Sequence, residues 1–154
     1  MKRALFLDRD GTLIEHVPYI NEPDKVKLID AVVRKVKEFQ KKGYLIVIIT
    51  NQSGIARGKI TPAQYEAVNE RMVSLLKEEG VSIDGIYFCP SHPDEKDPRR
   101  KPEIGMLLDA ARELGITLSE SIMVGDKESD VEAGKNAKVK LSLRLEEFLA
   151  LGDF

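Results

Sequence analysis

Cysteine is nearly absent from this sequence. Cys89 is the only cysteine in 154 residues, so the chain cannot form an internal disulfide, which argues against a disulfide-held secreted scaffold. The sequence also lacks a run of about twenty apolar residues, the length needed for a membrane-spanning helix. Its N-terminus enters an apolar strand without the signal region of a secreted protein. We therefore expect a cytoplasmic protein with no membrane partner.

The sequence also has no strong excess of positive or of negative charge. The 24 Lys and Arg residues nearly balance the 26 Asp and Glu residues, which leaves a net charge of −2. A nucleic-acid-binding protein typically carries a basic surface, so we expect no nucleic-acid partner. No linker, repeat or low-complexity stretch divides the chain, and its length suits a single domain over residues 1–154. We expect that domain to be a monomer.

Short apolar runs alternate with helix-like segments along the chain. Such alternation predicts an α/β fold, with a parallel sheet of about five strands, helices on both faces and right-handed crossovers. No segment is long enough for a large cap domain, so the insertions at residues 15–24 and 89–98 are expected to form the rim of an open site. Strands are predicted at residues 4–7, 44–49, 83–88, 121–124 and 138–143, with helices at 30–42, 61–79 and 103–114.

Two carboxylates follow the first apolar run directly. The sequence DRDGT at residues 8–12 places Asp8 and Asp10 at the end of the first predicted strand. Side chains two positions apart in an extended segment point to the same side, and open parallel sheets bind ligands beyond the carboxyl ends of their strands. Two crowded acids favour Mg²⁺, which prefers oxygen ligands. An ordinary Asp-Gly turn is the alternative.

Polar side chains also follow the second predicted strand. Thr50, Asn51, Gln52 and Ser53 precede Gly54, and hydroxyl, amide and backbone N–H groups of this kind are suited to binding phosphate. A simple loop is the alternative here.

Charged residues gather at two later positions. Arg100 and Lys101 precede a predicted helix, where they are either site residues or part of a solvated surface. The sequence GDKESD at residues 125–130 places Asp126 and Asp130 after another strand. Either could instead serve a helix, Asp126 as an N-cap and Asp130 as an acid of the first turn.

Together these four segments, in this order, resemble the four motifs of the haloacid dehalogenase superfamily of phosphohydrolases. The strings TNQSGIARG at residues 50–58, RKP at 100–102 and VGDK at 124–127 are similar to one branch of it. That branch contains D-glycero-D-manno-heptose 1,7-bisphosphate 7-phosphatases and histidinol-phosphate phosphatases. The resemblance implies a three-layer Rossmann-like fold and a magnesium-dependent phosphomonoesterase that forms an aspartyl-phosphate. Heptose bisphosphate is the expected small-molecule substrate, and histidinol phosphate is the alternative.

The resemblance and the chemistry of the residues assign expected roles. Asp8 is the expected nucleophile, and Asp10 is the expected general acid and base. Mg²⁺ is expected to contact Asp8, the main-chain carbonyl of Asp10, and Asp126, with Asp130 either a water-mediated partner of the metal or a helix acid. Arg57 and Arg100 suit the outer part of the substrate, including a second phosphate. The expected phosphate and substrate contacts are Thr50, Asn51, Gln52, Ser53, Arg57, Arg100 and Lys101.

One loop departs from the pattern of the resembled branch. Heptose-bisphosphate enzymes usually carry a zinc loop just before the Arg-Lys-Pro segment. The four aligned ligand positions are Cys89, Ser91, Asp97 and Arg99, of which Cys89 alone is a good zinc ligand. Structural zinc needs four good nitrogen or sulfur donors, and His92 nearby does not make up the set. We therefore expect no zinc and a compact turn without metal.

A receiver domain of a signalling protein is the alternative from a different class. It also combines an acidic magnesium site with an acceptor Asp, a Thr and a Lys at strand ends. However, the acceptor of a receiver lies on a middle strand, whereas Asp8 follows the first strand. A receiver also lacks a second carboxylate such as Asp10 to activate water, so the enzyme is the preferred interpretation.

Overall fold

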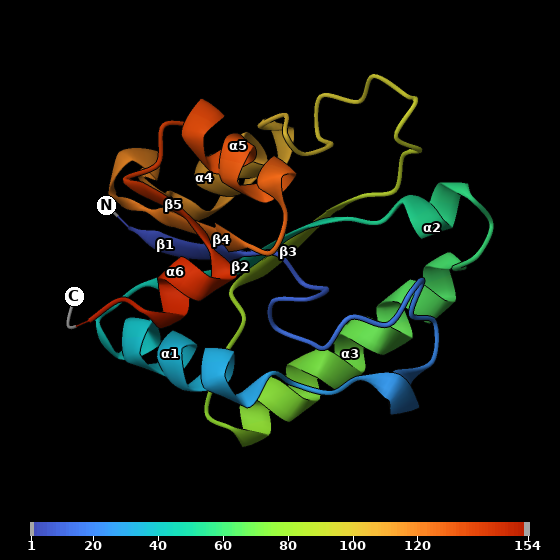
Figure 1. Cartoon of the computed structure of the whole chain (residues 1–154), viewed down its shortest axis with the longest axis horizontal. Helices are drawn as coiled ribbons and strands as arrows, with labels where there is room; N and C mark the ends of the chain where they lie inside the picture. Colours follow the sequence, from blue (N-terminus) through green and yellow to red (C-terminus); the bar gives the residue numbers. More distant parts are fainter. Residues whose placement is uncertain (1, 153–154) are drawn as a thin grey trace.

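Five short strands form one parallel sheet at the centre of the computed structural model, which describes residues 2–152 (Figure 1). The spatial order is β3-β2-β1-β4-β5 and every neighbouring pair is parallel, which confirms the predicted sheet. The single-domain prediction over residues 1–154 also covers Met1, Asp153 and Phe154, which lie outside the described residues. The strands are β1 (Ala4–Leu7), β2 (Leu45–Asn51), β3 (Gly85–Cys89), β4 (Ile122–Gly125) and β5 (Leu141–Arg144).

Helices cover both faces of the sheet and give the expected three layers. Figure 1 shows α4 and α5 on one side of the sheet and α1, α3 and α6 on the other. Within residues 2–152, no helix is long and apolar enough to cross a membrane. The α-helices are α1 (Asp30–Lys41), α2 (Ser53–Ala56), α3 (Pro62–Glu78), α4 (Gly105–Leu114), α5 (Glu128–Asn136) and α6 (Leu145–Leu149), and the 3₁₀ turns are η1 (Pro23–Lys25) and η2 (Leu118–Glu120).

The alternation of side chains along β1 separates two apolar cores. Leu5 and Leu7 pack into the core beneath α1, α3 and α6, whereas Ala4 and Phe6 pack into the core beneath α4. All four side chains are fully buried, as expected for a central strand covered on both faces. The residues that follow β1 are therefore fixed at the carboxyl end of the central strand.

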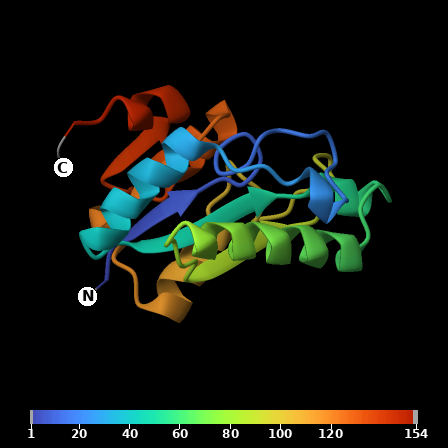
Figure 2. The ribbon, with the colours of Figure 1, turned by 90° about the horizontal axis from the view of Figure 1, so that it is seen from below.

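The chain path places the carboxyl ends of three strands together. From β1 the chain proceeds outward to β2 and β3, and then crosses to β4 on the other side of β1. In such sheets ligands bind where the strand order reverses. The connections after β1 and β3 run past this edge, and Figure 2 shows β1 and β2 pointing toward the side where these loops gather. Residues of the loop after β1 line the predicted open site, whereas residues 89–98 line neither of its hollows. Among residues 2–152, no cap domain covers this edge.

Two helices near the carboxyl ends of the strands do not begin where the sequence predicted. As predicted, α3 begins at Pro62, and Thr61 forms a capping box with Gln64. The helix expected from residue 103 begins instead at Gly105. Asp126 is not an N-cap, because α5 begins at Glu128 with Lys127 in the cap position. Asp126 is therefore free of a capping role and lies at the end of β4.

Candidate active site

Asp8 lies at the meeting point of the three central strands. Its backbone N–H donates to the carbonyl of Val124 on β4 at 3.0 Å, so hydrogen bonding to the neighbouring strand fixes the backbone there. Its side chain is nearly buried, and Oδ1 accepts a hydrogen bond from Nζ of Lys101 at 2.9 Å. The first carboxylate of the DRDGT segment is thus paired with the lysine of the RRKP segment.

Lys101 is a buried ammonium shared by several acceptors. Its Nζ donates to Asp8, to Oδ1 of Asp130 at 2.5 Å and to the carbonyl oxygen of Ile49 at 2.7 Å. Burial alone would lower the pKa of Lys101, but the charges of Asp8 and Asp130 outweigh burial and raise that pKa. Lys101 therefore remains charged and partly offsets the negative charge of the site.

Asp8, Asp126 and Asp130 form a crowded acidic cluster. One oxygen of each carboxylate lies within 4.8 Å of the others. Burial and the nearby Asp8 charge raise the pKa of Asp126 to about 6, and the same two causes raise the pKa of Asp130. Oδ1 of Asp126 is buried and has no hydrogen-bond partner among the described residues. This set of hard oxygen donors, with an unsatisfied buried oxygen, fits a divalent cation such as Mg²⁺.

Two glycines allow this close approach. Gly11 has a φ of +79°, and a Cβ there would lie 2.3 Å from Oδ2 of Asp126. A Cβ on Gly125 would lie 2.2 Å from Cβ of Asp130. Side chains at these positions would push the acidic residues apart, so both glycines of the motifs are required by space, and Gly11 also by its backbone conformation.

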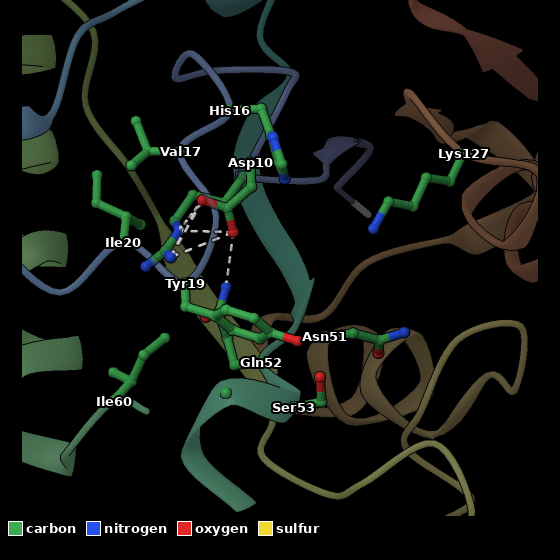
Figure 3. A pocket seen from close by; sticks show the side chains of 12 residues that line it. Asp10, His16, Val17, Tyr19, Ile20, Asn51, Gln52, Ser53, Ile60 and Lys127 are labelled. Carbon is green, nitrogen blue, oxygen red and sulfur yellow. Dashed lines mark hydrogen bonds and ion pairs between the residues drawn. The ribbon is translucent and has the colours of Figure 1, made fainter. Parts of the chain in front are cut away.

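Asp10 faces the same cavity as Asp8 but has different partners. Gln52 donates from Nε2 to Oδ2 of Asp10 at 2.9 Å and to Oγ1 of Thr50 at 2.9 Å. Arg9 holds the carboxylate from the other side, with Nη2 at 3.2 Å from either oxygen. Figure 3 shows Asp10 and Gln52 pointing toward one another. Gln52 was expected to contact the substrate. In the structure its side-chain amide orients Asp10.

Asn51 links the end of β2 to the lysine segment. Its Oδ1 accepts from the backbone N–H of Lys101 at 3.0 Å, and its Nδ2 donates to the Lys101 carbonyl at 3.2 Å. This two-way clamp fixes the backbone beneath the Lys101 ammonium. Asn51 therefore positions Lys101 in addition to lining the cavity.

The site opens into two adjoining hollows. One is a cavity of about 330 Å³ with Asp8, Asp10, Asp130, Arg100 and Lys101 in its wall. The second, shown in Figure 3, shares four residues with it and extends toward the loop after β1. The shared residues are Asp10, Asn51, Ser53 and Lys127. A ligand seated at Asp8 can therefore extend past Asp10.

Some expected residues lie apart from this cavity. Arg57 is exposed after α2, where its Nε donates to Oγ of Ser53 at 3.4 Å, and it lines neither hollow. Thr50 is fully buried and also lines neither hollow. Asp130 accepts from the Lys127 backbone N–H in the first turn of α5, as expected of a helix acid, and it also lies in the acidic cluster.

Sequence reasoning missed three positive residues around the acids. Arg9 is almost fully buried and donates from Nη1 to Asn69 on α3 at 2.8 Å. Arg144 donates from Nη1 to the Asp126 carbonyl at 2.9 Å, and Lys127 lines both hollows. Two local signals could have identified two of them: Arg9 lies between the site acids Asp8 and Asp10, and Lys127 directly follows Asp126.

Comparison with known proteins places this site in a family. Residues 3–142 match the sequence profile of the family described as "Polynucleotide kinase 3 phosphatase". A D-glycero-β-D-manno-heptose-1,7-bisphosphate 7-phosphatase of Haemophilus influenzae is 47% identical over 149 residues, which cover 93% of this chain and 81% of that protein. The Escherichia coli K12 protein of the same name is 45% identical over 88% of this chain and 75% of its own length.

A solved structure agrees with the sequence comparison. The D,D-heptose 1,7-bisphosphate phosphatase of B. bronchiseptica, in complex with magnesium and phosphate, superposes with a TM-score of 0.84. Its sequence is 29% identical, and the match covers 99% of this chain and 88% of that one. The chain therefore belongs to the polynucleotide kinase 3 phosphatase family of haloacid dehalogenase-like phosphatases.

Proposed function

We propose that this protein is a magnesium-dependent phosphatase that removes the 7-phosphate of D-glycero-β-D-manno-heptose 1,7-bisphosphate. The observation that carries the chemistry is the Asp8 carboxylate, held 2.9 Å from the Lys101 ammonium at the base of an open cavity. The names of the close relatives supply the substrate. Membership of a phosphatase family argues against the receiver module considered from the sequence.

In the proposed first step, an oxygen of Asp8 attacks phosphorus while the bond to the 7-oxygen of the sugar breaks. Asp10 in its protonated form donates a proton to that departing oxygen. In the second step, Asp10 accepts a proton from water, which attacks phosphorus and releases phosphate from Asp8. The hydrogen bonds from Arg9 and Gln52 keep the Asp10 carboxylate directed at the cavity.

Charge stabilisation is the other requirement of phosphoryl transfer. Lys101 supplies a fixed ammonium beside Asp8. The residues proposed to hold Mg²⁺ are Asp8, Asp126 and the Asp10 carbonyl, with Asp130 beside them. Bound there, Mg²⁺ reduces the repulsion between an anionic nucleophile and an anionic substrate.

The outer part of the cavity suits a second phosphate. Arg100 and Lys127 line its wall together with the polar side chains of Asn51 and Ser53. Guanidinium groups bind phosphate through paired N–H donors. We therefore propose Arg100 and Lys127 as contacts for the phosphate that is not cleaved, with Arg57 further out.

A substrate panel tests the proposal. We would measure magnesium-dependent phosphate release as kcat/KM for both anomers of heptose 1,7-bisphosphate, histidinol phosphate, other sugar phosphates and a 3′-phosphorylated oligonucleotide. A preference of several hundredfold for the β-heptose bisphosphate supports the proposal. Selective turnover of histidinol phosphate or of the oligonucleotide would replace the substrate, and no release from any of them would refute the phosphatase assignment.

The cytoplasmic location, the monomeric state and the absence of a nucleic-acid partner are also proposals. The net charge of −2 supports the last of these. Light scattering of the purified protein tests the monomer, and fractionation of cells tests the location.

A further inference from the structure

The connection between β3 and α4 carries two residues of the site wall. It leaves the sheet at Cys89, extends outward (Figure 1), and returns with Arg100 and Lys101 lining the 330 Å³ cavity. The Asn51 clamp holds Lys101 directly. The position of Arg100 depends instead on the residues just before it.

The carboxylate of Asp97 accepts hydrogen bonds from several residues of this loop. Asp97 accepts a hydrogen bond from Oγ of Ser91 at 2.5 Å and from Sγ of Cys89 at 3.4 Å. It also accepts from Arg99, through the backbone N–H at 2.9 Å, Nε at 3.4 Å and Nη2 at 3.3 Å. We call these four residues, Cys89, Ser91, Asp97 and Arg99, the Asp97 hub. They occupy the four positions that align with the zinc ligands of the resembled heptose-bisphosphate enzymes.

The hub has the electrostatic character of a satisfied ion pair. The Ser91 hydroxyl, followed by the Arg99 backbone N–H and guanidinium, holds the pKa of Asp97 well below its usual range. The carboxylate is thus charged and fully engaged at neutral pH. It joins the end of β3 to the far side of the loop through hydrogen bonds and the ion pair with Arg99.

Arg100 is attached to this hub at both ends. Its backbone N–H donates to the Asp97 carbonyl at 3.0 Å, and its Nη1 donates to the Ser91 carbonyl at 3.3 Å. Within residues 2–152, no carboxylate forms an ion pair with the Arg100 guanidinium. The hub therefore fixes a positive group in the cavity wall without neutralising it.

We propose that Asp97 is a positioning residue, which holds residues 90–99 without metal so that Arg100 binds the second, uncleaved phosphate of a bisphosphate substrate. This inference rests on the proposed function for its substrate class. Asp97 itself touches neither the reacting phosphate nor Asp8. Its loss should weaken binding of the second phosphate and leave the chemistry at Asp8 intact.

Asp97→Asn tests the hub, because it removes the charge and keeps the shape. Asp94→Asn is the matched control, since Asp94 lies in the same loop with a highly exposed side chain. We would measure kcat and KM for heptose bisphosphate and for p-nitrophenyl phosphate, which has no second phosphate. For Asp97→Asn we expect kcat/KM to fall about tenfold for the bisphosphate, mainly through KM. The p-nitrophenyl phosphate values, and all values for Asp94→Asn, should stay within about twofold.

Hydrogen exchange of the Arg99 and Arg100 amides gives a readout that needs no substrate. Faster exchange in Asp97→Asn than in Asp94→Asn supports the hub even if heptose bisphosphate proves not to be the substrate. Unchanged exchange, an equal loss of activity on both substrates, or one tightly bound zinc per wild-type chain would each overturn the proposal. A wild-type enzyme with no preference for bisphosphates would refute the proposed function and the role given to Arg100, while the exchange result would still judge the hub.

Discussion

The acidic cluster and the Asp97 hub both centre on carboxylates, but their electrostatic states are opposite. In the acidic cluster, Asp8 and Asp130 share the ammonium of Lys101. The pKa of Asp126 is raised, and one of its oxygens has no hydrogen-bond partner among the described residues. At the Asp97 hub, one carboxylate accepts five hydrogen bonds and its pKa is lowered. The first group has more negative charge than its surroundings satisfy, whereas the second is balanced.

This difference separates a site that acts on a ligand from one that holds a loop. Crowded like charges destabilise the metal-free fold, and such a cost is typical of functional sites. A carboxylate that is fully hydrogen-bonded by its own loop needs no ligand and contributes to structure. The contrast predicts that changes in the acidic cluster mainly alter chemistry, and changes in the hub mainly alter geometry.

The largest effect is expected for Asp8→Asn. Asparagine cannot form the aspartyl-phosphate, so kcat should fall by more than about 10⁴-fold. The substitution keeps the shape of the side chain, and circular dichroism and the melting temperature should show a folded protein. Steady-state phosphate release and a phosphoenzyme trap on the same preparations measure the effect. Substantial turnover by Asp8→Asn would show that another residue is the nucleophile.

A triple substitution asks whether the hub positions converge as closely as their hydrogen bonds indicate. Ser91→His, Asp97→Cys and Arg99→Cys, combined with Cys89, supply one imidazole and three thiolates, a set typical of structural zinc. We expect this variant to bind one zinc per chain and to melt at a higher temperature with zinc than without it. Metal analysis and thermal melts measure both. Wild-type protein treated in parallel is the control, and a variant that binds no zinc would contradict the geometry.

Much of the catalytic cluster could be predicted from sequence because its signals are local. The apolar run 4–7 predicts a buried strand, and parallel strands bring their carboxyl ends to one edge, so Asp8 and Asp126 were expected to meet. They do so because β1 and β4 are neighbours. Lys101 was also expected in the site, and its Nζ contacts Asp8 although the two residues lie 93 positions apart.

Contacts that depend on side-chain direction could not be predicted in this way. Gln52 was assigned to the substrate and lines one hollow of the site, but the hydrogen bonds from its Nε2 to Asp10 and Thr50 were not foreseen. Arg9 is buried, and Asn69, 60 positions away, accepts one of its hydrogen bonds. The Asp97 hub depends on the path of a loop that no periodic pattern describes. Residue type and spacing indicate the chemistry, but the packing of distant segments decides which partner each polar group takes.

A smaller effect is expected for the stability of the metal-free Asp126→Asn variant. Because the pKa of Asp126 in the folded protein is raised to about 6, the folded state binds more protons than the unfolded state between pH 4 and 6. Stability of the wild type should therefore fall as pH rises through that window. At pH 7 the neutral asparagine should make the metal-free fold more stable by about 1 kcal/mol.

Thermal melts in chelator measure this gain, and melts in Mg²⁺ provide the comparison. Magnesium should raise the melting temperature of the wild type and have little effect on Asp126→Asn, because the variant lacks a ligand. A metal-free variant less stable than the wild type would indicate that the acidic cluster is not a site of unfavourable charge.

The smallest effect concerns the acid stability given by the hub. Since the pKa of Asp97 is lowered in the folded protein, its ionised form contributes stability above its ordinary pKa near 4, and that contribution is lost as pH falls below this value. Asp97→Asn should melt about 2–4 °C below the wild type at pH 7. The gap should narrow steadily below pH 4, because the carboxyl of the unfolded wild type becomes protonated there while the folded protein still holds it ionised.

The exposed Asp94→Asn variant is the control for this pH series and should follow the wild type throughout. Ser91→Ala removes the hydroxyl that lowers the pKa of Asp97 most, so it should reproduce part of the loss at pH 7. A gap between Asp97→Asn and the wild type that is equally large at pH 7 and pH 3 would mean that the side-chain charge is not what stabilises the loop. Only the acidic cluster would then couple ionisation to the stability of the fold, and the hub would hold its loop through hydrogen bonds that do not depend on charge.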